Sequence, residues 1–140
     1  MELSLSYPST LRLLSLNCEN LFLSYDEGAL SGKSPKLVSR LAATILRHDP
    51  DTVFLSEVGG AHSLEIFNKD YLGERYRPCL LPGNSERGIE LAVLSKNDLP
   101  LKSEHPTHCD RVLTNDPTIV TEKRVTRHFS RDCLEYHLFA

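Results

Sequence analysis

An apolar run near the N-terminus predicts a buried strand. Residues 11–16 are hydrophobic except for Arg12 and Ser15, and the run ends at Asn17, where polar residues gather. The following stretch, residues 26–34, holds two glycines and few apolar positions, which predicts a loop. This part of the chain is therefore expected to contribute one strand and one loop.

An amphipathic helix is predicted to follow this loop. Ser34 provides a helix cap, and Pro35 occupies the first helical position, where its missing N–H does no harm. The helix is expected to end before Pro50, because the residue that precedes a proline resists the helical conformation. One face carries apolar residues at helical spacing: Leu37, Val38, Leu41, Ala42, Ile45 and Leu46.

The remaining segments predict a second helix and several strands. We expect strands at residues 52–55, 76–81, 89–94, 119–125 and 133–139, and a helix at about residues 63–72. Residues 103–116 are rich in His, Pro, Thr and Asp and are expected to be irregular. This order predicts an α/β (α+β) fold in which two amphipathic helices pack against a mixed β-sheet.

Length and composition indicate a globular protein. The 140 residues are one domain's worth, so residues 1–140 are expected to form a single domain. The net charge of −3 argues against a protein that binds nucleic acid by bulk positive charge. The sequence contains no apolar run of about 18–20 residues, as a membrane span needs, and no secretory signal. A cytoplasmic chain is therefore expected, and its four widely spread cysteines are expected to be reduced thiols.

Two strand ends carry side chains suited to a divalent cation. Glu57 follows the apolar strand at residues 52–55, and Asn17 and Glu19 follow the first strand. Strand ends of open α/β sheets are common ligand sites, and Mg²⁺ prefers oxygen donors supplied by one or two carboxylates. Taken singly, Glu57 also fits a solvated acid at a strand–loop junction, and Asn17 fits a residue that caps a turn.

Four segments in order resemble the endonuclease/exonuclease/phosphatase superfamily, which includes the pancreatic-type deoxyribonucleases. They are the Asn-Cys-Glu-Asn-Leu-Phe run from Asn17, the Glu57-Val58 strand end, the Gly-Asn-x-x-Arg-Gly-Ile turn at residues 83–89 and the Phe-Ser-Arg step at residues 129–131. The resemblance implies a four-layer αββα sandwich of which this chain covers about the N-terminal half.

The resemblance also implies a phosphoesterase that depends on Mg²⁺ or Mn²⁺. Glu57 matches the metal-ligand glutamate and Asn17 the asparagine beside the metal, while Glu19 matches an acid that reaches the metal through water. Arg131, and more weakly Arg87, match arginines that contact the substrate phosphate. The implied substrate is a phosphodiester, with a slight preference for nucleic acid over phospholipid head groups or inositol phosphates.

The sequence departs from the superfamily in its missing catalytic motifs. The Gly-Asp-x-Asn motif, which supplies the aspartate that activates water, does not occur, and neither does the Ser-Asp-His motif. The last predicted strand stops at Ala140 without a polar taper, so the sequence is expected to be truncated. The chain is therefore expected to hold a metal ligand without the general base.

Three alternatives remain open at this point. A non-catalytic fragment or interaction module would expose a sheet edge and an apolar face, through which it would self-associate or bind a partner. A basic strip at residues 122–132 would bind DNA, although such a strip is usually a solvated face. A zinc site would use a group of nitrogen and sulfur donors: His105, His108 and Cys109, with His128 or Cys133.

Overall fold

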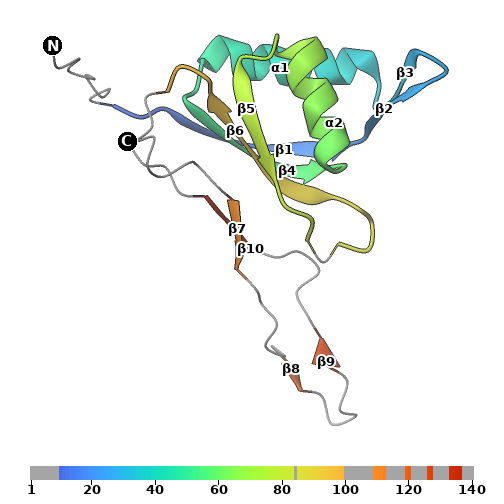
Figure 1. Ribbon diagram of the computed structural model, residues 1–140, viewed down its shortest axis with the longest axis vertical. Coiled ribbons are helices and arrows are strands. Elements are labelled where there is room, and N and C mark those ends of the chain that lie inside the picture. The colour runs from blue at the N-terminus through green and yellow to red at the C-terminus, as the bar shows by residue number, and fades with distance from the viewer. Residues whose placement is uncertain are drawn as a thin grey trace, which may run out of the picture.

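A mixed four-stranded sheet forms the centre of the structure (Figure 1). The computed structural model describes residues 10–83 and 85–99 and, beyond them, the backbone of four short strands. The strand order is β1-β4-β6-β5, in which β1 runs parallel to β4, and β6 runs antiparallel to both β4 and β5. The bounds are β1 (Leu13–Leu21), β4 (Thr52–Val58), β5 (Tyr76–Leu80) and β6 (Glu90–Lys96).

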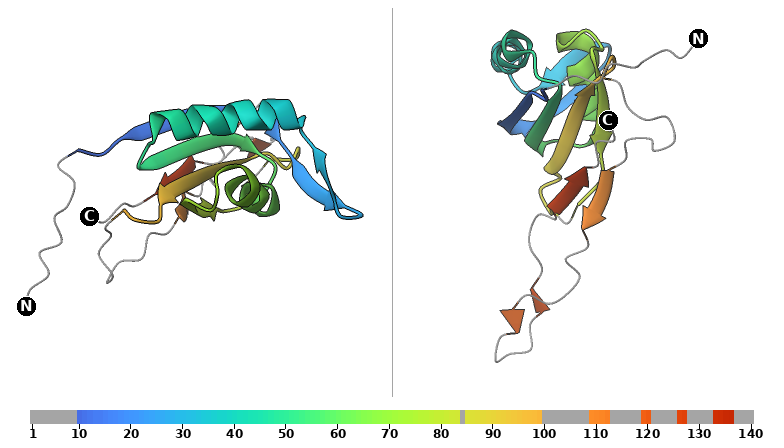
Figure 2. Two further views of the ribbon diagram at one scale, coloured as in Figure 1. Left: turned by 90° about the horizontal axis from the view of Figure 1, so that it is seen from above. Right: turned by 90° about the vertical axis from the view of Figure 1, so that its left-hand side faces the viewer.

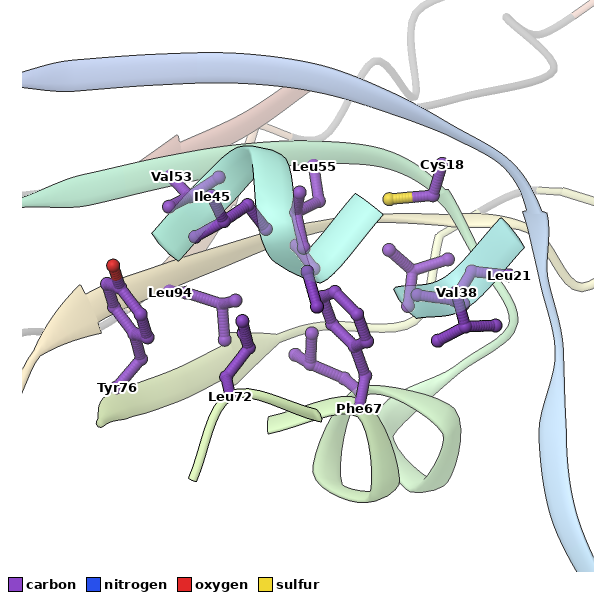
Figure 3. Packing of buried hydrophobic residues seen from close by; sticks show 14 of the residues in the cluster. Cys18, Leu21, Val38, Ile45, Val53, Leu55, Phe67, Leu72, Tyr76 and Leu94 are labelled. Atoms are coloured by element: carbon purple, nitrogen blue, oxygen red, sulfur yellow. The ribbon is translucent and has the colours of Figure 1, made fainter. Parts of the chain in front are cut away.

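Two helical segments pack on one face of this sheet, which confirms the predicted α/β class. They are α1 (Pro35–His48) and α2 (Ala61–Ile66), and α2 continues into a π-helical turn, η1 (Phe67–Tyr71). Figure 3 shows their side chains meeting those of the sheet in a single core. Its members include Val38 and Ile45 of α1, Val53 and Leu55 of β4, Phe67 of η1, Tyr76 of β5 and Leu94 of β6.

Helix α1 follows the sequence prediction closely. Pro35 stands at its first turn, and the carbonyl of Ser34 accepts the backbone N–H groups of Leu37 and Val38, although the Ser34 hydroxyl makes no capping hydrogen bond. The helix ends at Asp49, which adopts a left-handed conformation with φ of 46°. The side-chain carboxylate of Asp49 lies 3.0 Å from the Lys96 ammonium, which ties this helix end to the end of β6.

A hairpin replaces the loop that the sequence predicted at residues 26–34. Strands β2 (Leu23–Asp26) and β3 (Ala29–Gly32) pair antiparallel and project from the body of the fold (Figure 2). Their two-residue turn consists of Glu27 and Gly28, with φ of 50° and 81°. Two positive φ angles in a two-residue hairpin turn match the twist of the strands on either side. The prediction of a loop was wrong because Gly28 forms part of a hairpin turn here and does not end the regular structure on either side of it.

The second helix begins two residues earlier than predicted and ends in a wider turn. The π-helical turn η1 buries both Phe67 and Asn68, which are neighbours in sequence. A buried amide needs partners, and Asn68 finds them on Tyr76: its Nδ2 donates to the Tyr76 carbonyl at 2.7 Å, and its Oδ1 accepts the Tyr76 N–H at 3.4 Å. The helix therefore fixes the first residue of β5.

The C-terminal third differs from the prediction in two strands. Strand β7 (Cys109–Val112) lies inside the stretch that was expected to be irregular, and it pairs antiparallel with β10 (Cys133–Tyr136). Strands β8 (Ile119–Val120) and β9 (Thr126–Arg127) form a second short pair. Strands β8 and β10 fall within the predicted strands 119–125 and 133–139, whereas residues 126–127 of β9 lie outside every predicted strand. Among the described residues, no helix is long and apolar enough to span a membrane.

Candidate functional site

The candidate site lies where β1 and β4 both depart from regular strand geometry. Asn17 faces Ser56 in the parallel ladder, and the next paired residues are Leu21 and Val58, so the register shifts between them. Strand β4 shifts its register against β6 over the same residues, between Leu55 and Val58. Beyond the shift, the Gly59 N–H donates to the Leu21 carbonyl at 2.7 Å, and this hydrogen bond restores the pairing of the two strands. The irregularity is thus confined to a few residues near the C-terminal ends of both strands.

The two irregular segments share one burial pattern. In β1, two exposed residues, Glu19 and Asn20, stand between the buried Cys18 and Leu21. In β4, two half-buried residues, Ser56 and Glu57, stand between the buried Leu55 and Val58. Strict alternation would place only one residue between two core positions. Each strand therefore turns an extra polar residue away from the core, which is what β-bulges do beside functional sites.

Left-handed backbone angles accompany both bulges. Glu19, Asn20 and Glu57 have φ values of 50°, 60° and 61°. For a non-glycine residue this conformation costs about 1–2 kcal/mol. Such strain persists only when the surrounding structure holds it, and it is common in ligand sites.

The Asn17 amide is oriented by a local hydrogen bond. Its Oδ1 accepts the backbone N–H of Glu19 at 2.8 Å, so Asn17 does cap the turn that follows it. The carbonyl oxygen keeps a second lone pair, and the Nδ2 group makes no hydrogen bond to any described residue. Asn17 therefore has donors and an acceptor left for a bound water, carboxylate or phosphate.

Charges of both signs lie close to the buried Cys18 thiol. Burial raises the pKa of Cys18 to about 12, nearby Lys33 lowers it, and the Glu57 carboxylate raises it further. The Lys33 ammonium donates to the Glu19 carbonyl at 2.7 Å, so the residue after β3 returns to the end of β1. The site thus combines Glu57 with Lys33 around a thiol that stays protonated at neutral pH.

Arg87 reaches the same end of the sheet from a distant part of the chain. Its guanidinium donates to the Asn20 side-chain oxygen at 2.8 Å. The loop that carries Arg87 is held at its base by a hydrogen bond from the Gly83 N–H to the Glu90 carboxylate at 2.7 Å. Glu90 in turn pairs with Val58 of β4. Of the two arginines predicted to contact phosphate, Arg87 belongs to this site, and Arg131 lies outside the described residues.

The donor set fits a hard divalent cation. Glu57, Glu19 and Asn17 offer only oxygen ligands, and Mg²⁺ or Mn²⁺ is usually held by one or two carboxylates together with water. In residues 10–83 and 85–99, no cluster of three or more His, Cys, Asp or Glu side chains forms a ready metal cage. This arrangement suits a metal that keeps most of its water.

Two cations and a cavity beside β1 complete the surroundings. A pocket of about 210 Å³ lies between the edge strand β1 and α1. It is lined by Asn17, Cys18, Glu19, Lys33, Leu37, Arg40, Leu41 and Thr44. The sequence did not point to Lys33 or Arg40, because Lys33 falls in the predicted loop at residues 26–34 and Arg40 lies outside the apolar face of the predicted helix. The Glu-Gly turn at residues 27–28 was the signal that would have returned Lys33 to the site.

Two other predictions concern residues outside the description. The zinc alternative depends on His105, His108 and His128, and the basic strip depends on residues 122–132, of which only the backbone of β9 is described.

The expectation of reduced thiols holds for the free Cys18 and is wrong for Cys79, which is disulfide-bonded. Sequence spacing failed here because a disulfide joins residues that only the tertiary fold brings together.

The comparisons with known proteins leave the family open. No family model matches this sequence, and no curated protein or solved structure is similar enough to it to count as a match.

Proposed function

We propose that this chain carries the metal-binding and phosphate-binding part of a phosphoesterase that depends on Mg²⁺ or Mn²⁺. The observation that supports it is the pair of matched bulges, which turn Glu57 and Glu19 away from the core at neighbouring strand ends. Neighbouring strands lie about 4.8 Å apart. Oxygen donors from β1 and β4 are therefore within reach of one hydrated cation.

Each residue has a distinct role in this proposal. Glu57 is the direct ligand, and Glu19 contacts the cation through water. Asn17 donates from Nδ2 to a metal-bound water or to the Glu57 carboxylate. When bound, the cation neutralises charge on the phosphoryl oxygens and on the leaving oxygen.

Arg87 binds the substrate phosphate in this scheme. A guanidinium makes two parallel hydrogen bonds to phosphate oxygens. Its positive charge stabilises the negative charge that develops on the phosphoryl group during hydrolysis. The hydrogen bond to Asn20 uses one of its five N–H donors, so most of the guanidinium remains for the ligand.

The test measures metal binding and hydrolysis together. Wild-type protein is titrated with Mn²⁺ and followed by electron paramagnetic resonance, and its hydrolysis of an aryl phosphodiester is measured with Mg²⁺. We expect Glu57→Gln to weaken Mn²⁺ binding by at least about 10-fold, since even groups that only support a ligand contribute about 10–100-fold. The control is Glu65→Gln, an exposed acid on α2 that removes the same charge. Equal Mn²⁺ affinity in the two variants would exclude Glu57 as a ligand, and equal hydrolysis would exclude a catalytic role.

A second candidate function is an interaction module, and the opposite face of the sheet favours it. Leu13 and Phe54 are 54% and 36% exposed there, and a shallow apolar cavity of about 110 Å³ lies beside Phe54. Apolar side chains gathered on an open sheet face mark contact surfaces. Sedimentation of the metal-free protein distinguishes the two candidates. An interaction module is expected to self-associate, and Phe54→Ser is expected to abolish this without changing Mn²⁺ binding.

A further inference from the structure

The segment from Lys33 to the end of α1 carries an unusual distribution of charge. It contains Lys33, Lys36, Arg40 and Arg47 and no acidic residue, in a chain whose acids outnumber its lysines and arginines by 19 to 16. Surface helices commonly place an acid four residues from a base, which stabilises them. Here the residue four positions from Lys36 is another cation, Arg40, and this arrangement is destabilising.

The helix dipole explains only part of this pattern. Arg47 and His48 lie in the last turn, where cations stabilise a helix. Lys36 lies in the first turn, where a cation is unfavourable, and this turn holds no acid. Neither Lys36 nor Arg40 forms an ion pair or side-chain hydrogen bond with any described residue. Lys36 and Arg40 therefore have no structural partner in the described part of the chain.

These cations stand on the side of α1 that faces away from the core. At about 100° per residue, Lys36, Arg40 and Arg47 fall within about 40° of one another and opposite the buried Val38 and Ile45. Arg40 also borders the β1–α1 pocket of about 210 Å³, together with Thr44, Lys33 and Asn17. Within the pocket lining, two cations face one acid, Glu19.

The pocket shares its wall with the candidate metal site. Asn17 and Glu19 belong to both, and the pocket lies between β1 and α1 while Glu57 lies on the neighbouring strand β4. Strand β1, which lines the pocket, lies directly beside β4, and neighbouring strands are about 4.8 Å apart. A ligand whose reacting group lies at Glu57 can thus place a second anionic group in the pocket.

We propose that the β1–α1 pocket binds a second phosphate group of the substrate, held by the guanidinium of Arg40 and the Lys33 ammonium. The proposal rests on the function proposed above and narrows it to substrates with at least two phosphate groups. That chemistry has two sources, a nucleic-acid strand and a small polyphosphorylated molecule. Lys36 extends the positive surface beyond the pocket and attracts further phosphates of a longer ligand.

The test measures binding of a fluorescent oligothymidylate by anisotropy in EDTA at low salt. Without metal, neither Glu57 nor hydrolysis contributes to the result. We expect Arg40→Gln to weaken binding by about 10-fold, as for the loss of a charged hydrogen-bonded contact. Arg40→Lys should recover only part of the affinity, because lysine lacks the planar fork. The matched control, Arg47→Gln, removes the same charge from the same helix away from the pocket and should change the affinity by less than about 3-fold.

Competition identifies the source of the phosphates. Inositol hexakisphosphate that displaces the oligonucleotide from wild-type protein but not from Arg40→Gln would assign the pocket to small polyphosphates. Failure to displace it would assign the pocket to a nucleic-acid strand. Equal losses in Arg40→Gln and Arg47→Gln, or no oligonucleotide binding at low salt, would overturn the proposal. A further outcome is that oligonucleotide binding depends on Arg40 while Glu57→Gln leaves the Mn²⁺ affinity unchanged. That combination would refute the proposed phosphoesterase and would support the phosphate pocket alone.

Discussion

The hydroxyl of Ser63 joins the start of α2 to β2 next to the candidate site. Its side chain is buried, and Oγ accepts the Leu23 N–H at 3.0 Å. The same Oγ lies 3.2 Å from two carbonyl oxygens, those of Leu23 and Gly59, to which the hydroxyl can donate its proton. Leu23 faces Gly32 at a position where the strands exchange no hydrogen bond, since Lys33 N donates to Phe22 O beside it. The Leu23 N–H therefore depends on Ser63.

Ser63→Ala is expected to leave this buried N–H without a partner. A buried donor that loses its acceptor costs about 1–3 kcal/mol of the free energy of unfolding. The higher helix propensity of alanine offsets up to about 0.5 kcal/mol of this loss in the free energy of unfolding. The net loss should be about 0.5–2.5 kcal/mol, or a fall in Tm of about 3–5 °C for each kcal/mol in a chain of this size.

Urea unfolding followed by circular dichroism measures this loss, since the chain has no tryptophan. Ser39→Ala is the matched control, because Ser39 is an exposed residue of α1 with the same gain in helix propensity. We expect the two variants to differ by about 1–3 kcal/mol. Amide hydrogen exchange at Leu23 should also accelerate in Ser63→Ala alone. Identical unfolding curves for the two variants would refute the reasoning.

Two further predictions concern the hairpin and the end of α1. Gly32→Ala should destabilise the fold by about 2–4 kcal/mol in urea unfolding, because φ is 110° and a Cβ there would lie 2.0 Å from the Phe22 carbonyl oxygen. Gly28→Ala, with positive φ but open space around it, should cost about 1–2 kcal/mol, and equal losses would contradict the steric argument. The hydrogen bond from Lys96 lowers the pKa of Asp49, so this carboxylate stabilises the fold above its unfolded pKa of about 3.9 and loses that effect as the pH falls further. Asp49→Asn should thus be less stable than wild type at pH 6, and the difference should shrink as the pH falls below about 3.9, as thermal melts at pH 6 and pH 2 would show.

Local signals in the sequence were sufficient for the elements of the core. Helix α1 was predicted from Ser34 and Pro35 at its start and from the apolar spacing of Val38 to Ile45, and the structure confirms it. These signals act over a few residues, so no tertiary contact is needed to read them. The sequence also placed Asn17 and Glu57 directly after apolar strand residues, but the observed strands β1 and β4 both extend beyond them.

The tertiary structure alone decided how those residues meet. The sequence predicted that Asn17 ends its strand, whereas β1 continues to Leu21 through a bulge, because parallel pairing with β4 holds the chain extended. The contact of Arg87 with Asn20 joins residues 67 positions apart, and Lys33 reaches Glu19 only because a hairpin returns the chain. Register, bulges and long-range contacts depend on the pairing of distant segments, and hydrophobic periodicity within one segment does not encode that pairing.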